Sequence, residues 1–148
     1  MTDNKTVFLD TAPLIYFLDN NVLYAEKMMR IFDSLLSNND RLVSSVITAE
    51  EYLVYPLRTG NQQKVDVFFE FTADYGIDLI PVSLAIAKKA AYIRAAFPSF
   101  KSMDALQLAA AAETGCDLFL TNDKQLKQFE EIPCVTVDEW NMEGKEKG

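Results

Sequence analysis

A short apolar run that ends in a carboxylate is the feature that most constrains the fold of this chain. Residues 7–9 (Val-Phe-Leu) are continuously apolar, as expected of a strand that is covered on both faces of a sheet. Asp10 follows where this strand should end, and Thr11 and Pro13 are suited to begin a helix. Ligand sites in open parallel sheets form outside the carboxyl ends of the strands. We therefore expect Asp10 to lie at the edge of a sheet that carries a functional site.

The rest of the chain alternates between strand-like and helix-like segments. Further apolar, strand-like runs occur at 41–45, 77–82, 117–120 and 134–137. Apolar residues at helical spacing lie between the runs, at 13–19, 22–37, 48–59, 61–75, 84–97, 103–114 and 124–130. This alternation predicts a three-layer α/β/α sandwich around a mostly parallel five-stranded sheet. We expect a single domain over residues 1–148, with its core at about 6–140 and a charged tail at 143–148.

The composition excludes several kinds of chemistry. The 148 residues contain no histidine, which removes Ser-His-Asp and Cys-His catalysis, histidine zinc sites and a histidine general base. The five glycines form neither a dinucleotide fingerprint nor a P-loop. No apolar run is long enough to span a membrane and the N-terminus lacks a signal peptide, so we expect a cytoplasmic protein. Any reaction must therefore use carboxylates, hydroxyls, amides or lysines.

Four carboxylates are predicted to meet at one edge of the sheet. Asp10 follows the first strand, Glu51 lies in the first helical turn after the second, Asp104 begins the alanine-rich helix, and Asp123 follows the fourth strand. Four such groups would repel one another unless a cation lay among them. Oxygen ligands suit Mg²⁺ or Mn²⁺, which can activate water for phosphodiester hydrolysis. The net charge of −8 is consistent with such a site and argues against general affinity for nucleic acid.

Each acid also has a purely structural interpretation. Asp10 could satisfy turn amides, residues 48–51 (Thr-Ala-Glu-Glu) match a capping box, Asp104 would be favoured by the helix dipole, and Asp123 could be an N-cap. Helix capping does not require four acids at one edge, and one geometry can serve capping and ligation in succession. The joint pattern therefore favours a cation site.

Four segments of the chain form a recognisable pattern: Val-Phe-Leu-Asp-Thr at 7–11, Ser-Val-Ile-Thr-Ala-Glu-Glu-Tyr-Leu-Val at 45–54, Met-Asp-Ala-Leu-Gln-Leu-Ala at 103–109 and Phe-Leu-Thr-Asn-Asp at 119–123. Together they resemble the PIN-domain nucleases, and among them most closely the VapC-type toxins of type II toxin–antitoxin systems. The segments occur in the family's order, and the resemblance covers roughly residues 6–137. It implies a Mg²⁺- or Mn²⁺-dependent endoribonuclease with a PIN-like α/β fold.

The resemblance also implies roles for individual residues. It places the catalytic acids at Asp10, Glu51, Asp104 and Asp123, of which the three aspartates would hold the metal. Glu51 is preferred to its neighbour Glu50 because the family's glutamate follows the threonine by three positions. Thr121 and Asn122 would support the last acid by hydrogen bonding. The family further implies an RNA substrate, a homodimer and a small antitoxin protein whose peptide occupies the groove at the site.

Other functions stay open at the level of sequence. A haloacid-dehalogenase-type phosphatase also has an aspartate after its first strand, but it needs a second acid where this chain has Ala12. The chain could instead be a catalytically weak PIN-like module that binds RNA or protein, or a stand-alone PIN nuclease without an antitoxin. The four acids argue against the loss of metal binding.

Overall fold

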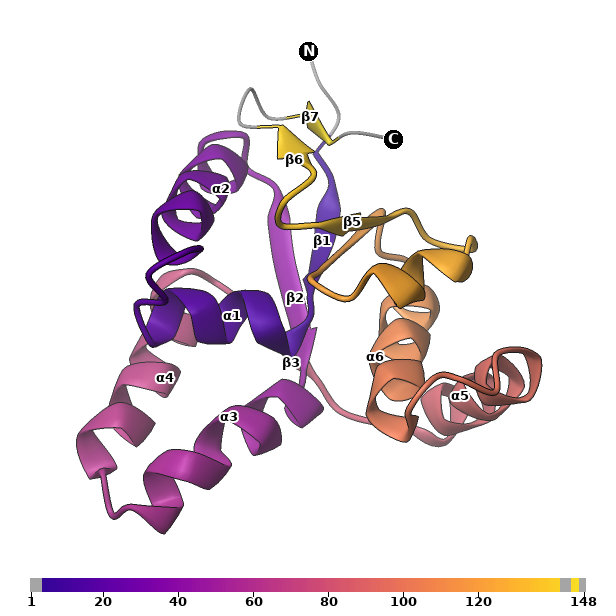
Figure 1. Ribbon diagram of the computed structural model, residues 1–148, viewed down its shortest axis with the longest axis horizontal. Helices are drawn as coiled ribbons and strands as arrows, with labels where there is room; N and C mark the ends of the chain where they lie inside the picture. Colours follow the sequence, from indigo (N-terminus) through magenta and orange to yellow (C-terminus); the bar gives the residue numbers. More distant parts are fainter. Residues whose placement is uncertain (1–3, 142–144, 147–148) are drawn as a thin grey trace.

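Parallel strands form the centre of the computed structural model, which describes residues 4–141 and 145–146 of the chain (Figure 1). The sheet consists of β1 (Thr6–Leu9), β2 (Arg41–Ser45), β3 (Asp78–Ile80), β4 (Leu118–Thr121) and β5 (Cys134–Thr136). Its strand order is β3-β2-β1-β4-β5, and every neighbouring pair is parallel. The predicted parallel sheet is confirmed, with each strand within about two residues of its expected position.

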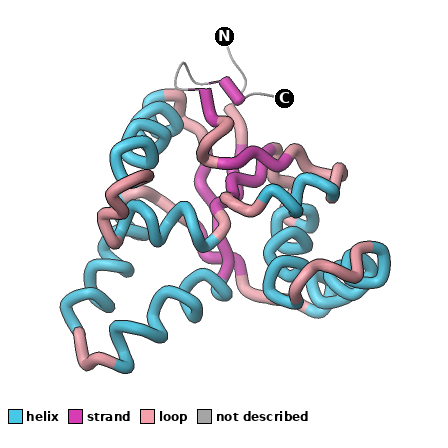
Figure 2. The backbone as a smooth tube through the Cα atoms, viewed as in Figure 1, coloured by secondary structure: helices cyan, strands magenta, loops and turns pink. Residues whose placement is uncertain are grey.

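Helices cover both faces of this sheet, as Figures 1 and 2 show. One layer contains α1 (Thr11–Leu18), α2 (Ala25–Ser37), α3 (Val46–Arg58) and α4 (Gln62–Asp74). The other contains α5 (Leu84–Ala96) and α6 (Ser102–Glu113), with the short 3₁₀ helix η1 (Lys124–Gln128) packed beside them. The α/β/α sandwich predicted from the alternating pattern is therefore confirmed.

The alternation of side chains along the strands divides the core into two halves. Phe8 of β1 and Phe119 of β4 stack at 5.2 Å between ring centroids and pack with α5 and α6. Val7 and Leu9 point to the opposite face, where they pack with helices α1, α2 and α4. A strand buried on both faces needs apolar residues at every position, which explains the continuous apolar run at the start of the chain.

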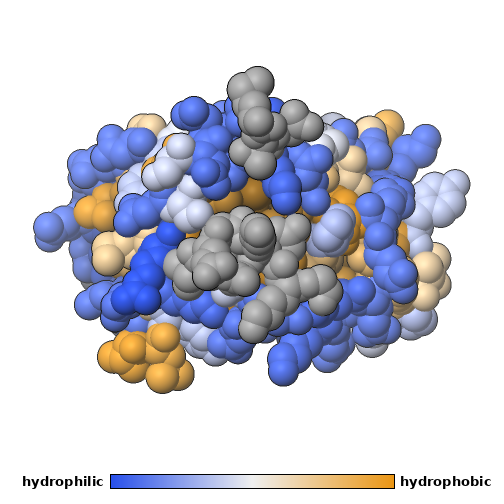
Figure 3. All heavy atoms as spheres, turned by 90° about the horizontal axis from the view of Figure 1, so that it is seen from above, coloured by the Kyte–Doolittle hydropathy of each residue, from blue (hydrophilic) through white to orange (hydrophobic). Residues whose placement is uncertain are grey.

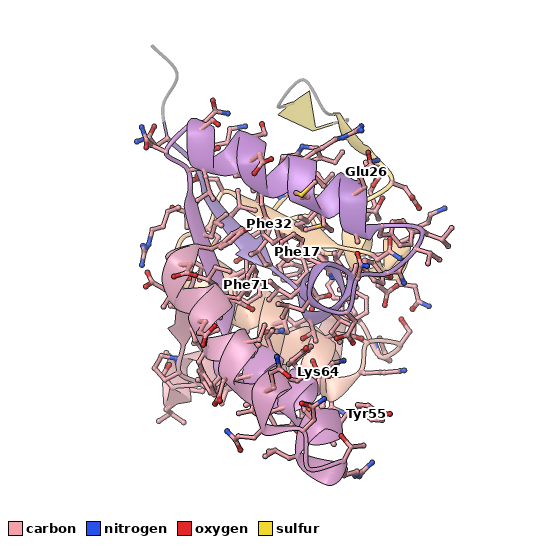
Figure 4. All side chains as sticks on the ribbon, turned by 90° about the vertical axis from the view of Figure 1, so that its left-hand side faces the viewer. Phe17, Glu26, Phe32, Tyr55, Lys64 and Phe71 are labelled. Carbon is pink, nitrogen blue, oxygen red and sulfur yellow. The ribbon has the colours of Figure 1, made fainter. Side chains whose placement is uncertain are left out.

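Aromatic rings dominate the core on the face of the sheet that α1, α2 and α4 cover. Phe17 of α1, Phe32 of α2 and Phe71 of α4 converge between their helices, with ring centroids 5.0 to 5.7 Å apart (Figure 4). Rings at these distances gain favourable edge-to-face contacts in addition to the burial of their surface. This cluster holds α1 and α2 against α4 and so fixes the position of α1 over the sheet.

The order of the strands creates a switch point at β1. The chain passes outward from β1 to β2 and β3, and then returns to place β4 on the other side of β1. The backbone N–H of Asp10 donates to the carbonyl of Leu120 at 2.9 Å, so the carboxyl ends of β1 and β4 lie together. Crevices for ligands form at such reversals of strand order. Asp10 and the residues after β4 lie on this edge.

Helix α3 starts earlier than the sequence predicts. Ser45 is its N-cap and accepts a hydrogen bond from the backbone N–H of Ile47 at 3.1 Å, so β2 passes directly into the helix. The proposed capping box of Thr48 and Glu51 is therefore wrong, and Glu51 lies in the second turn. Helix α6 differs by one residue: its N-cap is Lys101, not Ser102.

The ends of the described chain add a small antiparallel pair. β6 (Trp140–Asn141) pairs with β7 (Lys145–Glu146), which lies within the segment expected to be a charged tail; its other residues, 143, 144, 147 and 148, lie outside the described residues. The described surface at this end is mostly hydrophilic (Figure 3). No helix within residues 4–141 has the length and hydrophobicity needed to cross a lipid bilayer.

The close approach of α6 to the sheet leads to a prediction about stability. Ala109 is fully buried in this helix, so a leucine in its place must displace well-packed neighbours. We expect Ala109→Leu to lower the free energy of unfolding by about 1–3 kcal/mol in urea denaturation. Ala95→Leu, at an exposed position of α5, is the matched control and should change it by less than about 0.5 kcal/mol. Equal effects of the two changes would contradict this packing.

Candidate functional site

The structure brings the four predicted acids to one cavity at the carboxyl edge of the sheet. The cavity has a volume of about 500 Å³. It is lined by Asp10, Thr11, Ala12, Ile15, Tyr16, Glu51, Asp104, Thr121, Asn122 and Asp123. Of the two adjacent glutamates, Glu51 lines the cavity, whereas Glu50 is exposed elsewhere on α3. Among the described lining residues none is lysine or arginine, so the cavity is strongly acidic.

Asp10 lies at the centre of this arrangement. It is the N-cap of α1, and its carboxylate accepts hydrogen bonds from the Thr11 backbone N–H at 2.9 Å and the Thr121 hydroxyl at 2.8 Å. Burial raises the pKa of Asp10 to about 6; the negative charges of Asp104 and Glu51 add to the rise, and the two hydrogen bonds oppose it. The site therefore makes the charged form of Asp10 unfavourable until another group compensates it.

Thr121 connects the first acid to the last. The Thr121 hydroxyl, which is fully buried, donates to Asp10 and accepts a hydrogen bond from the backbone N–H of Asp123 at 3.1 Å. Asp123 is the N-cap of η1, and its carboxylate accepts from the backbone N–H of Gln125 at 3.0 Å. One hydroxyl at the end of β4 thus fixes the relative positions of two of the acids.

The other two acids come from helices on opposite faces of the sheet. Asp104 is the third residue of α6 and accepts a hydrogen bond from the Lys101 backbone N–H at 3.3 Å. Burial and the charge of Asp123 raise the pKa of Asp104. Glu51 reaches the cavity from α3, where its carboxylate accepts a hydrogen bond of 2.6 Å from the Thr11 hydroxyl. Asp10 and Asp123 are thus also N-caps, as the structural interpretation anticipates, and Asp104 accepts a backbone hydrogen bond at the start of its helix.

Asn122 has a different partner from the one that the family resemblance implies. Its side-chain amide donates to the hydroxyl of Tyr16 at 2.6 Å rather than to the carboxylate of Asp123. Tyr16 in turn stacks on Tyr24, with ring centroids 4.6 Å apart. The sequence does not predict this contact of Tyr16 at the cavity, because Tyr16 lies 106 residues from Asn122 and shows only ordinary helical spacing.

The chemistry of the cavity suits a hard divalent cation. Its donors are carboxylate, hydroxyl and amide oxygens, which Mg²⁺ and Mn²⁺ prefer. Burial, with the added repulsion from Asp104 and Glu51, raises the pKa of Asp10, and a bound cation would offset both effects. With the side chains as they stand, no group of three or more Asp, Glu or Cys residues in the described ranges is arranged to hold one ion. The acids thus share a cavity, and closure around a cation would require movement of their side chains.

The fold and the cavity together define a parallel α/β protein with an acidic site at the reversal of its strand order. A family model for the PIN domain matches residues 7–132. Since this match includes most of the chain and all four acids, the chain belongs to the PIN domain family. A search of curated proteins by sequence found no match.

Several solved structures share this fold. The DNA-bound VapBC of Salmonella typhimurium aligns with a TM-score of 0.72 and 18% identity over 90% of this chain and 98% of that chain. VapBC2 of Rickettsia felis, bound to a DNA fragment from its promoter, aligns with a TM-score of 0.69 and 18% identity over 88% of this chain and 98% of that chain. A toxin–antitoxin complex from Klebsiella pneumoniae aligns with a TM-score of 0.65 and 22% identity over 88% of this chain and 97% of that chain. At these identities the similarity establishes the shared fold.

The raised pKa of Asp10 predicts an unusual effect on stability. The folded protein binds a proton at Asp10 more tightly than the unfolded chain, whose pKa is 3.8, so this contribution is present below about pH 4 and is lost as the pH rises through about 6. Asp10→Asn keeps an equally good N-cap without the charge. In EDTA at pH 8 we expect it to raise the free energy of unfolding by about 1–2 kcal/mol, less than the full shift because the carboxylate is partly exposed.

Urea denaturation of the two proteins at pH 8 and pH 4 measures this effect, and the difference should shrink toward zero at the lower pH. Comparison at each pH cancels the titration of the groups that do not interact with Asp10. A variant that is less stable than the parent at pH 8 would contradict the prediction, because it would mean that the charged carboxylate of Asp10 stabilises the fold.

Proposed function

We propose that this chain is a metal-dependent endoribonuclease that hydrolyses RNA phosphodiester bonds. The observation that carries the proposal is the convergence of four acids on one cavity whose described lining residues include no lysine or arginine. A phosphodiester is itself anionic and would be repelled by such a cavity unless a cation were bound there. Membership of the PIN domain family supports the same chemistry.

Each acid has a part in the proposed mechanism. Asp10, Asp104 and Asp123 would hold Mg²⁺ or Mn²⁺, and Glu51 would complete the set of ligands or orient the attacking water. The bound cation would supply a water of lowered pKa and offset the charge of the scissile phosphate. Thr121 keeps Asp10 and Asp123 at fixed separation through its two hydrogen bonds. The chain's own contribution is thus to place carboxylates before the substrate arrives.

We further propose that the chain is the toxin of a toxin–antitoxin pair and forms a homodimer. The solved structures that share its fold include complexes described as VapBC or toxin–antitoxin. A second cavity of about 110 Å³ shares Ile15 and Glu51 with the acidic cavity and is also lined by Tyr55 of α3 and Lys64 of α4, whose side chains are labelled in Figure 4. An antitoxin peptide that crossed both cavities would contact the acidic site and the adjoining residues of α3 and α4.

Cleavage of a mixed cellular RNA pool tests the catalytic proposal. Purified protein with Mg²⁺ or Mn²⁺ should give a discrete set of cuts, and excess EDTA should abolish them. Asp104→Asn keeps the size of the side chain but removes a charged ligand, so we expect the cleavage rate to fall by about a hundredfold or more. Failure to cut with either metal would favour an RNA- or protein-binding module, and an active protein with no co-purifying antitoxin would favour a stand-alone nuclease.

The adjacent glutamates provide a matched pair of variants. Glu51 lines the cavity and Glu50 does not. We expect Glu51→Gln to lower the rate of RNA cleavage at least about tenfold, because it removes a charge from the cation site. Glu50→Gln makes the same chemical change one residue away, and its rate should stay within about twofold of the parent. The reverse order of effects would assign the catalytic acid to Glu50.

A further inference from the structure

A buried polar network lies directly behind the acidic cavity. It brings together side chains from four elements that are distant in the sequence. Its members are Thr11 at the start of α1, Ser44 and Ser45 at the end of β2, Thr48 in α3 and Gln107 in α6. Each of these side chains is at most 8% exposed. Burying polar groups at this depth costs folding free energy unless they are hydrogen-bonded. The direction of each hydrogen bond therefore shows which group holds which in place.

The protons can be assigned from the cavity inward. The Glu51 carboxylate can only accept, so the single hydroxyl proton of Thr11 points to it across 2.6 Å. The Thr11 oxygen must then accept from its other neighbours, the Thr48 hydroxyl at 3.0 Å and the Gln107 amide nitrogen at 3.3 Å. The contact between Thr11 and Glu51 is thus the outer end of a directed chain of hydrogen bonds.

Gln107 is the inner end of this chain. Its amide nitrogen donates to the Thr48 hydroxyl at 2.8 Å as well as to Thr11, and its carbonyl oxygen accepts from the Ser45 hydroxyl at 2.5 Å. Ser45 already accepts from the backbone of Ile47, so its own proton is free for this bond. The amide orientation therefore gives Thr11, Thr48 and Ser45 matching partners, and the single proton of Ser44 serves either the Leu9 carbonyl at 2.7 Å or the Thr48 oxygen at 2.8 Å. In the described residues, the one buried side-chain nitrogen or oxygen without a partner is in Trp140, outside this network.

We propose that Thr48 and Gln107 are positioning residues that hold Glu51 in the acidic cavity through Thr11. This inference rests on the proposed function, because it assigns a purpose to the placement of a catalytic acid. Glu51 is exposed on α3 and would otherwise be free to turn toward solvent. Gln107 lies one turn after Asp104 on α6, so this helix presents one acid directly and fixes a second through the network.

Mn²⁺ binding by the full chain, measured by titration calorimetry, tests the proposal without relying on activity. Thr48→Val keeps the shape of the side chain and removes its hydroxyl. Groups that orient metal ligands in this way contribute about tenfold or more to affinity, so we expect the dissociation constant to rise by about that factor. Thr48→Ser restores the hydroxyl and should return the dissociation constant to within about twofold of the parent.

Thr72→Val is the matched control, because Thr72 is a similarly buried threonine in α4 whose hydroxyl bonds to the Phe69 carbonyl, away from the cavity. It should bind Mn²⁺ as the parent does. If Thr48→Val fails to fold, Gln107→Met takes its place, because it removes both amide donors at similar length. Unchanged affinity in the Thr48 variant, an equal loss in the Thr72 variant, or no rescue by serine would overturn the inference alone. A parent chain that binds no Mn²⁺ would overturn the proposed function and this inference with it.

Discussion

Repulsion among carboxylates in one partly buried cavity is the constraint on which the rest of the site depends. Burial raises the pKa of Asp10 to about 6, and the charges of Asp104 and Glu51 add to the rise. The fold tolerates this repulsion because each acid has a local donor: the Thr11 and Thr121 hydrogen bonds to Asp10, the Thr11 hydroxyl for Glu51, and backbone N–H groups for Asp104 and Asp123. Helix capping and the cation site are therefore two uses of one geometry, since the groups that cap helices also hold the acids in place.

The sequence predicts the architecture well because hydrophobic burial decides it. Continuous apolar runs identify strands that are covered on both faces, and short connections place the ends of those strands and the starts of helices on one edge. That reasoning is local and additive, so it correctly brings Asp10, Glu51, Asp104 and Asp123 to one cavity. Their chemical roles depend on a bound ion and a substrate and stay predictions.

The local details that sequence could not decide involve choices between equivalent residues. Ser45 and Thr48 are both good N-caps, and the following glutamate favours Thr48 by pattern. The structure uses Ser45, because Thr48 is instead bonded to Gln107 and Thr11 inside the core. These two partners of Thr48 lie 37 and 59 residues away, a separation at which helix propensity carries no information. A single glutamine in an otherwise alanine-rich helix was the one visible signal.

The same helix explains why a polar network is retained in so well packed a core. Alanines let α6 lie close to the sheet, and this proximity brings Gln107 within reach of hydroxyls from α1, β2 and α3. A network with one member missing is worse than an apolar core, because the remaining groups lose their partners. A change in the position of α6 would therefore disturb Asp104 and Glu51 together. Tight packing and the placement of the acids are in this way one property of the fold, and not two features that could vary independently.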